Sequence, residues 1–104
     1  MVNQNSTQHI FLDQAQDLFP YTQSLRRDFH RHPELGFQET RTSGIVAQEL
    51  KSLGLMPTTG IAGTGVIVMI EGAHPGPVVM LRFDMDALPI LEQTGVDFAS
   101  QNNP

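Results

Sequence analysis

The chain has 104 residues and a mass of 11.5 kDa, which is enough for one domain of ordinary size or for a piece of a larger one. Hydrophobic residues make up 39% and charged residues 16%, a balance that excludes wholesale disorder. The net charge of −5 argues against a protein that coats nucleic acid, because such a role needs a basic face. Cysteine is absent, so disulfides, cysteine-based zinc sites and cysteine nucleophiles are excluded within this chain.

The amino-terminal residues do not have the pattern of a targeting segment. Residues 1–10 are polar, carry no lysine or arginine, and are not followed by an apolar run. The longest apolar runs, Val66–Ile70 and Val78–Leu81, are far shorter than the ~18 residues of a membrane span. We therefore expect a soluble, cytoplasmic protein with neither a membrane nor a nucleic-acid partner.

A first helix is predicted after a polar, frayed start at residues 1–8. Apolar residues recur there at spacings of three and four, which lines one face of a helix: Leu18, Tyr21, Leu25 and Phe29. Pro20 interrupts this pattern, so either one helix ends at Phe19 and another begins at Pro20, or a single helix is kinked. Pro33 predicts a stop near His32.

A second helix is predicted after the turn at residues 34–36. Its apolar face is formed by Val46, Leu50 and Leu53. Thr40 or Thr42 is expected to cap its start, and Gly54 lies where the glycine that follows a helix is usually found. Gly44 inside the helix costs roughly 1 kcal/mol relative to alanine, which suggests close packing at that position.

The second half of the chain reads as strands and loops. Residues 55–59 could form a short strand, and 66–70 and 78–83 are β-branched or apolar runs that we expect to pair as a hairpin. Because both runs are apolar on both faces, we expect them inside a covered sheet. Residues 60–65 are rich in glycine, but a strand rather than a helix follows, which argues against a dinucleotide-binding loop. Helices followed by strands predict an α/β fold.

Asp84 and Asp86 are the sharpest local signal for chemistry. They follow an apolar run that we expect to be a buried strand, and α/β sheets place ligand sites at such strand ends. Two carboxylates at this spacing can reach one cation, or one can orient a ligand while the other caps a turn. The alternative is that both only cap the loop, as aspartate often does.

Other polar residues have plainer interpretations. His30 and His32 at i and i+2 of a helix point to different faces, which argues against joint ligation of a metal. They suit the end of a helix, where the dipole favours cationic side chains. Arg82 is expected to form a salt bridge with a nearby carboxylate, whether or not the site is functional.

Taken together, several motifs in register resemble one enzyme family. They are HRHPELGF at His30–Phe37, GTGV at Gly63–Val66, the Gly76-Pro77 pair, and RFDMDALPI at Arg82–Ile90 with Glu92 after it. The chain resembles the metal-dependent amidohydrolases, which include hippurate hydrolases, N-acyl-amino-acid amidohydrolases and auxin-conjugate hydrolases, relatives of zinc carboxypeptidases and aminoacylases. The resemblance covers about residues 20–104. One departure is Phe83, where the family usually has alanine.

The resemblance implies a zinc-exopeptidase-like α/β catalytic domain with an inserted dimerisation domain. It implies hydrolysis of the amide bond of N-acyl amino acids, with two divalent ions, zinc or manganese, that activate a water, and a glutamate as general base. Asp84 matches the carboxylate that orients a metal ligand. In related exopeptidases that ligand is the histidine of a His-x-Asp motif, and Arg82 stands at its position. Asp86, Arg82, Glu92 and His32 are expected to support the site without binding metal.

The same resemblance implies that the chain is an amino-terminal fragment. Residues 1–104 would be the first part of the catalytic domain, with two helices, a strand hairpin and an incomplete sheet. The metal ligands, the general base and the dimerisation domain would all lie after Pro104, so the chain alone is expected to bind no metal firmly and to be inactive. The full-length family implies a small-molecule substrate and a possible homo-oligomer.

Two other functions are compatible with the residues. A strand that ends in Asp-x-Asp is also found in phosphohydrolases of the haloacid-dehalogenase type, with an aspartyl nucleophile and Mg²⁺. There, however, the motif lies near the chain start and continues with Gly-Thr, whereas Ala87-Leu88-Pro89 follows here. The other alternative is a small, non-catalytic interaction protein, against which the unfinished sheet argues.

Overall fold

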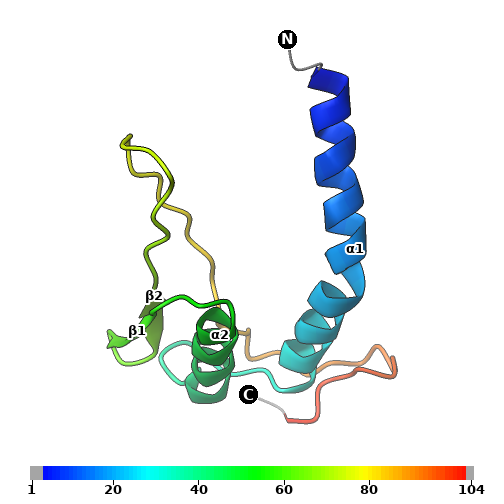
Figure 1. Cartoon of the computed structure of the whole chain (residues 1–104). Helices are drawn as coiled ribbons and strands as arrows, with labels where there is room; N and C mark the ends of the chain where they lie inside the picture. The colour runs from blue at the N-terminus through cyan, green and yellow to red at the C-terminus, as the bar shows by residue number, and fades with distance from the viewer. Residues whose placement is uncertain (1–3, 103–104) are drawn as a thin grey trace.

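The computed structural model describes the backbone of residues 4–102 and the side chains of residues 8–102. The order of elements is α1 (Gln4–Arg31), α2 (Thr40–Ser52), β1 (Thr58–Ile61) and β2 (Gly65–Ile67). Figure 1 shows α1 standing apart from α2 and the hairpin, joined to them at its carboxy-terminal end. The radius of gyration is 17.1 Å, against about 13 Å for a compact domain of 100 residues, so the chain is elongated.

Helix α1 is one continuous helix that includes Pro20. The kinked alternative is therefore confirmed, and Figure 1 shows the bend near the middle of the helix. Proline lacks the N–H of the helical ladder and its ring displaces the preceding turn, which accounts for the bend. The prediction of a frayed start over residues 1–8 was wrong from Gln4 on, because α1 begins there. Residues 1–3 lie outside the described part. The predicted stop is confirmed, because α1 ends at Arg31.

The start of helix α2 differs from the prediction, whereas its end agrees with the prediction. Its amino-terminal cap position is Glu39, whose side chain makes no capping hydrogen bond, so neither Thr40 nor Thr42 is the cap. At the other end Gly54 has φ +82°, and the Gly54 N–H donates to the Lys51 carbonyl at 3.0 Å. A positive φ costs glycine nothing, which explains why the helix ends there.

The antiparallel hairpin is formed by β1 and β2, which pair Thr58 with Ile67 and Ile61 with Gly65. A two-helix chain with a hairpin and an incomplete sheet is thus confirmed, but the paired segments are not the predicted ones. Residues 78–83 form no strand and are exposed; Leu81, for example, is 73% exposed. Beyond β2 the chain rises and returns as an extended arm (Figure 1). A strand forms only where its backbone groups pair with a neighbouring segment, and none of the described residues pairs with the arm in this way.

The buried interior is small and lies around the start of α2. Ala47 is the buried apolar residue of the described part, and Glu39, Thr42 and Ser43 are buried polar residues. The Thr64 hydroxyl donates to Glu39 Oε2 at 2.6 Å and so ties the hairpin turn to α2. Gly44 faces open space rather than a close neighbour, so the predicted close packing there was wrong. Within residues 4–102, no helix combines the length and apolar character that crossing a membrane requires.

Candidate functional site

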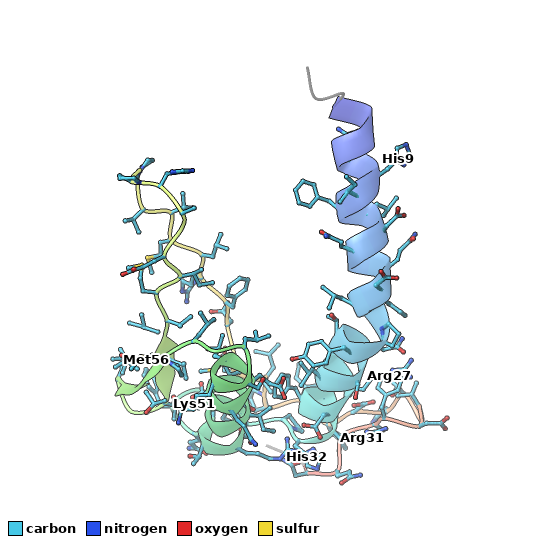
Figure 2. The ribbon with its side chains drawn as sticks, viewed as in Figure 1. His9, Arg27, Arg31, His32, Lys51 and Met56 are labelled. Carbon is cyan, nitrogen blue, oxygen red and sulfur yellow. The ribbon has the colours of Figure 1, made fainter. Side chains whose placement is uncertain are left out.

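An open hollow of about 530 Å³ lies where the end of α1 meets the loop of residues 84–92. Its walls carry carboxylates, two basic side chains and several apolar groups. The ionisable residues that line it are Arg26, His30, Glu34, Asp84, Asp86 and Glu92. Figure 2 shows that Arg27, Arg31 and His32 cluster at this same end of α1. The hollow therefore brings together residues that are some sixty positions apart in the sequence, such as His30 and Glu92.

The loop that carries Asp84 and Asp86 is fixed to the turn after α1. The Ala87 N–H donates to the Glu34 carbonyl at 2.7 Å. Next to it, a methyl group placed on Gly36 would lie 4.0 Å from Asp86 Oδ2, so the Asp86 carboxylate passes beside the turn. Both aspartates line the hollow. The buried strand that the sequence predicted before them is absent, because residues 78–83 form no strand.

Arg82 pairs with Asp84 in the way the sequence predicted, with Arg82 Nη2 3.0 Å from Asp84 Oδ1. The two side chains are 79% and 68% exposed. A salt bridge this exposed contributes little to stability, because water screens the charges and both side chains lose rotamer freedom. Arg82 itself is not among the residues that line the hollow.

Glu34 caps helix α2 from outside the helix. Its Oε1 accepts hydrogen bonds from the Thr42 N–H at 2.6 Å and the Thr42 hydroxyl at 2.7 Å, and its Oε2 accepts from the Arg41 N–H at 3.0 Å. Partial burial alone would raise the pKa of Glu34, but these hydrogen bonds to the ionised form outweigh it and hold the pKa below its usual value. The negative charge also suits the positive end of the helix dipole.

Glu92 is the acceptor that holds the last described loop to α1. Its Oε1 lies 2.6 Å from His30 Nε2 and accepts the Ser100 N–H at 3.0 Å, while its Oε2 accepts the Thr94 hydroxyl. The Thr94 and Ser100 hydrogen bonds, with a smaller contribution from His30, lower the pKa of Glu92. An ionised carboxylate can only accept, so His30 Nε2 carries the hydrogen in this pair.

An aromatic contact reinforces this loop. The Phe98 ring meets the His30 ring edge to face, with 5.4 Å between centroids, and the Arg27 guanidinium lies 4.4 Å above Phe98. Cation–π and edge-to-face contacts each add modest, directional stabilisation. Two further hydrogen bonds, from the Gln101 N–H to the Arg31 carbonyl and from Asn102 Nδ2 to the Pro33 carbonyl, complete the attachment.

His32 lies apart from the hollow and serves a different contact. Its Nδ1 is 3.0 Å from the Asp28 carbonyl oxygen, one turn back along α1. The Asp28 carboxylate in turn accepts two hydrogen bonds from Arg41 Nη2, both at 3.0 Å, and this contact lowers the pKa of Asp28. His30 and His32 thus have separate partners, in agreement with their predicted positions on different faces.

The residues described do not assemble a metal centre by themselves. Across residues 4–102, no group of three or more histidine, aspartate or glutamate side chains is placed so that it could hold an ion. What the hollow does offer is a set of carboxylate acceptors, Asp84, Asp86 and Glu92, next to the Arg26 and His30 side chains. Such an arrangement can orient a neighbouring group by hydrogen bonds, but it supplies no complete coordination shell.

Sequence reasoning missed the roles of His30 and Glu34. The spacing rule correctly separated His30 from His32, but no local pattern indicated that Glu92 would be the partner of His30. Glu34 was assigned to a turn, because a cap is normally sought at the residue just before the helix. The chain places it seven and eight residues before the amides that it accepts, and only the folded turn brings them together.

Comparisons with known proteins agree with the motifs. No family model matches the chain. A putative amidohydrolase of Bacillus subtilis, YhaA, is 48% identical over 77 residues, which cover 74% of this chain and 19% of that protein. The N-acyl-L-amino acid amidohydrolase of Geobacillus stearothermophilus is 46% identical over 77 residues, 74% of this chain and 21% of the relative. The chain thus spans about a fifth of the length of these curated relatives.

A solved structure gives the same answer for the fold. The YXEP protein of Bacillus subtilis, described as a dinuclear metal binding peptidase of the M20 family, matches with a TM-score of 0.78 at 39% sequence identity. The match covers 85% of this chain and 25% of that one. The resemblance that the motifs indicated is confirmed by both comparisons: over most of its length the chain is similar to part of several amidohydrolases and of a metal-binding peptidase of the M20 family.

Proposed function

We propose that this chain forms the first part of the catalytic domain of a hydrolase that cleaves the amide bond of N-acyl amino acids with the help of divalent metal ions. One observation carries the proposal. The two motifs that bear the family resemblance, around His30–Gly36 and around Asp84–Pro89, meet at one hollow and are joined by the Ala87–Glu34 hydrogen bond. The amidohydrolase relatives support the reaction class.

Within this proposal Asp84 is the carboxylate that orients a metal ligand. Asp86, Arg82, Glu92 and His32 do not touch the metal in this proposal. Of these four residues, Glu92 holds the last described loop to α1 through His30 and Ser100. Since residues 4–102 bring no three ligands together, the zinc or manganese ligands and the general base would come from the part of the family's chain that is not matched here. The 104-residue chain alone is expected to hydrolyse no N-acyl amino acid and to bind zinc weakly.

The substrate and cellular setting belong to the same proposal. The name of one relative, an N-acyl-L-amino acid amidohydrolase, supports a small N-acyl amino acid as the substrate. A cytoplasmic location and a homo-oligomeric complete enzyme are further parts of the proposal. The relatives give no support to the phosphohydrolase alternative, and the exposed Arg82–Asp84 pair does not have the shielded setting that an aspartyl nucleophile requires.

The test is a chimera. Residues 20–102 of this chain replace the matching segment of the Geobacillus stearothermophilus amidohydrolase, and hydrolysis of N-acetyl amino acids is followed with and without a chelator. We expect chelator-sensitive turnover, and a loss of about 100-fold in kcat when Asp84→Asn removes the orienting charge. Asp97→Asn, the same change at an exposed position outside the hollow, is the control and should leave kcat within about twofold.

Two results would contradict the proposal. One is a folded chimera, shown by native-like circular dichroism, that lacks activity. The other is an Asp84→Asn chimera that keeps full turnover. Phosphatase activity of the 104-residue chain with Mg²⁺, abolished by Asp84→Asn, would instead support the phosphohydrolase alternative.

A further inference from the structure

The loop that carries Asp84 and Asp86 is attached at two points, both after the carboxylates. The first attachment is the Ala87 N–H donating to the Glu34 carbonyl at 2.7 Å. The second is Glu92, whose Oε1 meets His30 Nε2 at 2.6 Å. Between them the described residues form no strand or helix, so the position of the loop depends on these two points.

We propose that His30 and Glu92 form a clasp that positions the Asp84–Asp86 loop against α1. His30 and Glu92 are positioning residues in this account, and they act through the loop rather than on a substrate. The proposal deepens the proposed function, on which its catalytic consequence rests, while the clasp itself is a statement about the folded chain. The family resemblance gives Glu92 only a general supporting role without a partner, and it gives His30 no role.

The hydrogen bonding of Glu92 supports the clasp. The Glu92 side chain is only 15% exposed and accepts from three donors, His30, Thr94 and Ser100. A largely shielded carboxylate is costly to leave without donors, and hydrogen bonds to a charged acceptor are stronger than those between neutral groups. The Glu92 side chain therefore has a strong preference for this one position.

The electrostatics explain why a hydrogen-bond donor from α1 is favourable opposite Glu92. The carboxylate lies at the carboxy-terminal end of α1, where the helix dipole repels negative charge. His30 offers an N–H donor there, and Arg27 adds a positive charge over the Phe98 ring that packs on His30. Without His30, Glu92 would face the negative end of the helix with no donor from α1. The pair is thus interdependent.

Hydrogen exchange of single amides in the 104-residue chain tests the clasp. Two amides report on it: Ser100, which donates directly to Glu92, and Ala87, which donates to the Glu34 carbonyl and touches neither clasp residue. We expect Glu92→Ala to accelerate exchange at both amides by about tenfold or more. The amide of Gly54, which closes the far end of α2, should not change.

A conservative variant and a double variant distinguish the loss of the His30–Glu92 contact from a general destabilisation of the fold. Glu92→Gln keeps an oxygen acceptor for His30 and Ser100, so exchange at Ala87 should return to within about threefold of the original. His30→Ala should match Glu92→Ala, and the double variant should be no faster than either alone, because each change breaks the same contact. Asp97→Ala, an exposed change in the same loop, is the control.

Several outcomes would overturn the clasp. Acceleration at Ser100 without any change at Ala87 would show that Glu92 orders only its own loop. Additive effects of His30→Ala and Glu92→Ala would also overturn the clasp, because the two residues would then act independently. So would an Ala87 amide that is not protected from exchange in the unsubstituted chain. In the chimera, Glu92→Ala should lower kcat about tenfold with KM within about twofold, and Glu92→Gln should restore it. An inactive chimera would contradict the proposed function. It would not affect the test of the clasp, which is the hydrogen-exchange measurement on the 104-residue chain.

Discussion

The Glu34 carboxylate closes the start of α2 by accepting both the backbone N–H and the hydroxyl of Thr42, at 2.6 and 2.7 Å. The same residue accepts the Ala87 N–H through its backbone carbonyl. Glu34 therefore links the first turn of α2 to the loop of the candidate site. A residue with both roles couples the stability of the helix to the position of the aspartates.

We expect Glu34→Ala to lower the free energy of unfolding by about 1 to 2 kcal/mol, because the first turn of α2 loses the acceptor for two backbone N–H groups. Glu34→Gln should cost less, since one amide oxygen remains as an acceptor. Urea unfolding followed by circular dichroism measures the difference. Glu71→Ala, which removes the same side chain from an exposed loop, is the control and should change little. Equal effects of Glu34→Ala and Glu71→Ala would contradict the capping role.

Acid should destabilise the chain over a defined range. The pKa of Asp28 lies below its ordinary 3.8 because Arg41 donates to it, and the pKa values of three glutamates, Glu34, Glu39 and Glu92, lie below 4.5. For Glu34 the hydrogen bonds outweigh the opposing effect of burial, for Glu39 the Thr64 hydroxyl is the main cause, and for Glu92 the Thr94 hydroxyl.

A lowered pKa in the folded chain means that the unfolded chain binds protons first as the pH falls. These carboxylates therefore stabilise the fold fully above about pH 4.5, and their contribution is lost as the pH falls through the lower folded values. We expect the urea midpoint to be flat with respect to these groups between about pH 6 and about pH 5 and to drop steadily below about pH 4.5. An unchanged midpoint down to about pH 3 would show that the four carboxylates are not engaged in solution.

Local pattern predicted the helices well and the strands poorly. The stop before Pro33 and the positive-φ glycine at Gly54 follow from backbone rules that hold in any surroundings. Residues 78–83 have strand-forming side chains, but a ladder is a contact between segments, and no described segment pairs with them. Residues 78–83 are mostly apolar, but whether they form a strand depends on a neighbouring segment, which local pattern does not specify.

The candidate site shows the same division. Asp84, Asp86 and Glu92 were selected from motifs, and all three line the hollow. Their partners could not be selected in this way, because the pairing of His30 with Glu92 spans 62 positions and has no periodic signature. His32, which was grouped with the site, contacts Asp28 instead. A polar contact between residues as distant in the sequence as His30 and Glu92 depends on the tertiary fold, which local pattern does not specify.

The bend of α1 is expected to depend on Pro20. Pro20→Ala restores a donor for the Gln16 carbonyl and removes the clash of the ring, so helicity at 222 nm should rise and unfolding should require about 1 to 3 kcal/mol more. Gln14→Ala, on the same helix, is the control for the gain that alanine gives by propensity alone. If both substitutions raised helicity equally, Pro20 would not be the cause of the bend.

The ion pair between Asp28 and Arg41 joins the end of α1 to the start of α2, with two 3.0 Å contacts from Arg41 Nη2. Both side chains are about one-third exposed, so each single reversal, Asp28→Arg or Arg41→Asp, should cost about 0.5 to 1 kcal/mol plus the repulsion of like charges. The double reversal should recover most of the loss, because the pair is reformed with opposite sense. Urea unfolding of all four chains forms the cycle. A double variant as unstable as the sum of the single ones would mean that the helices are held together without this pair.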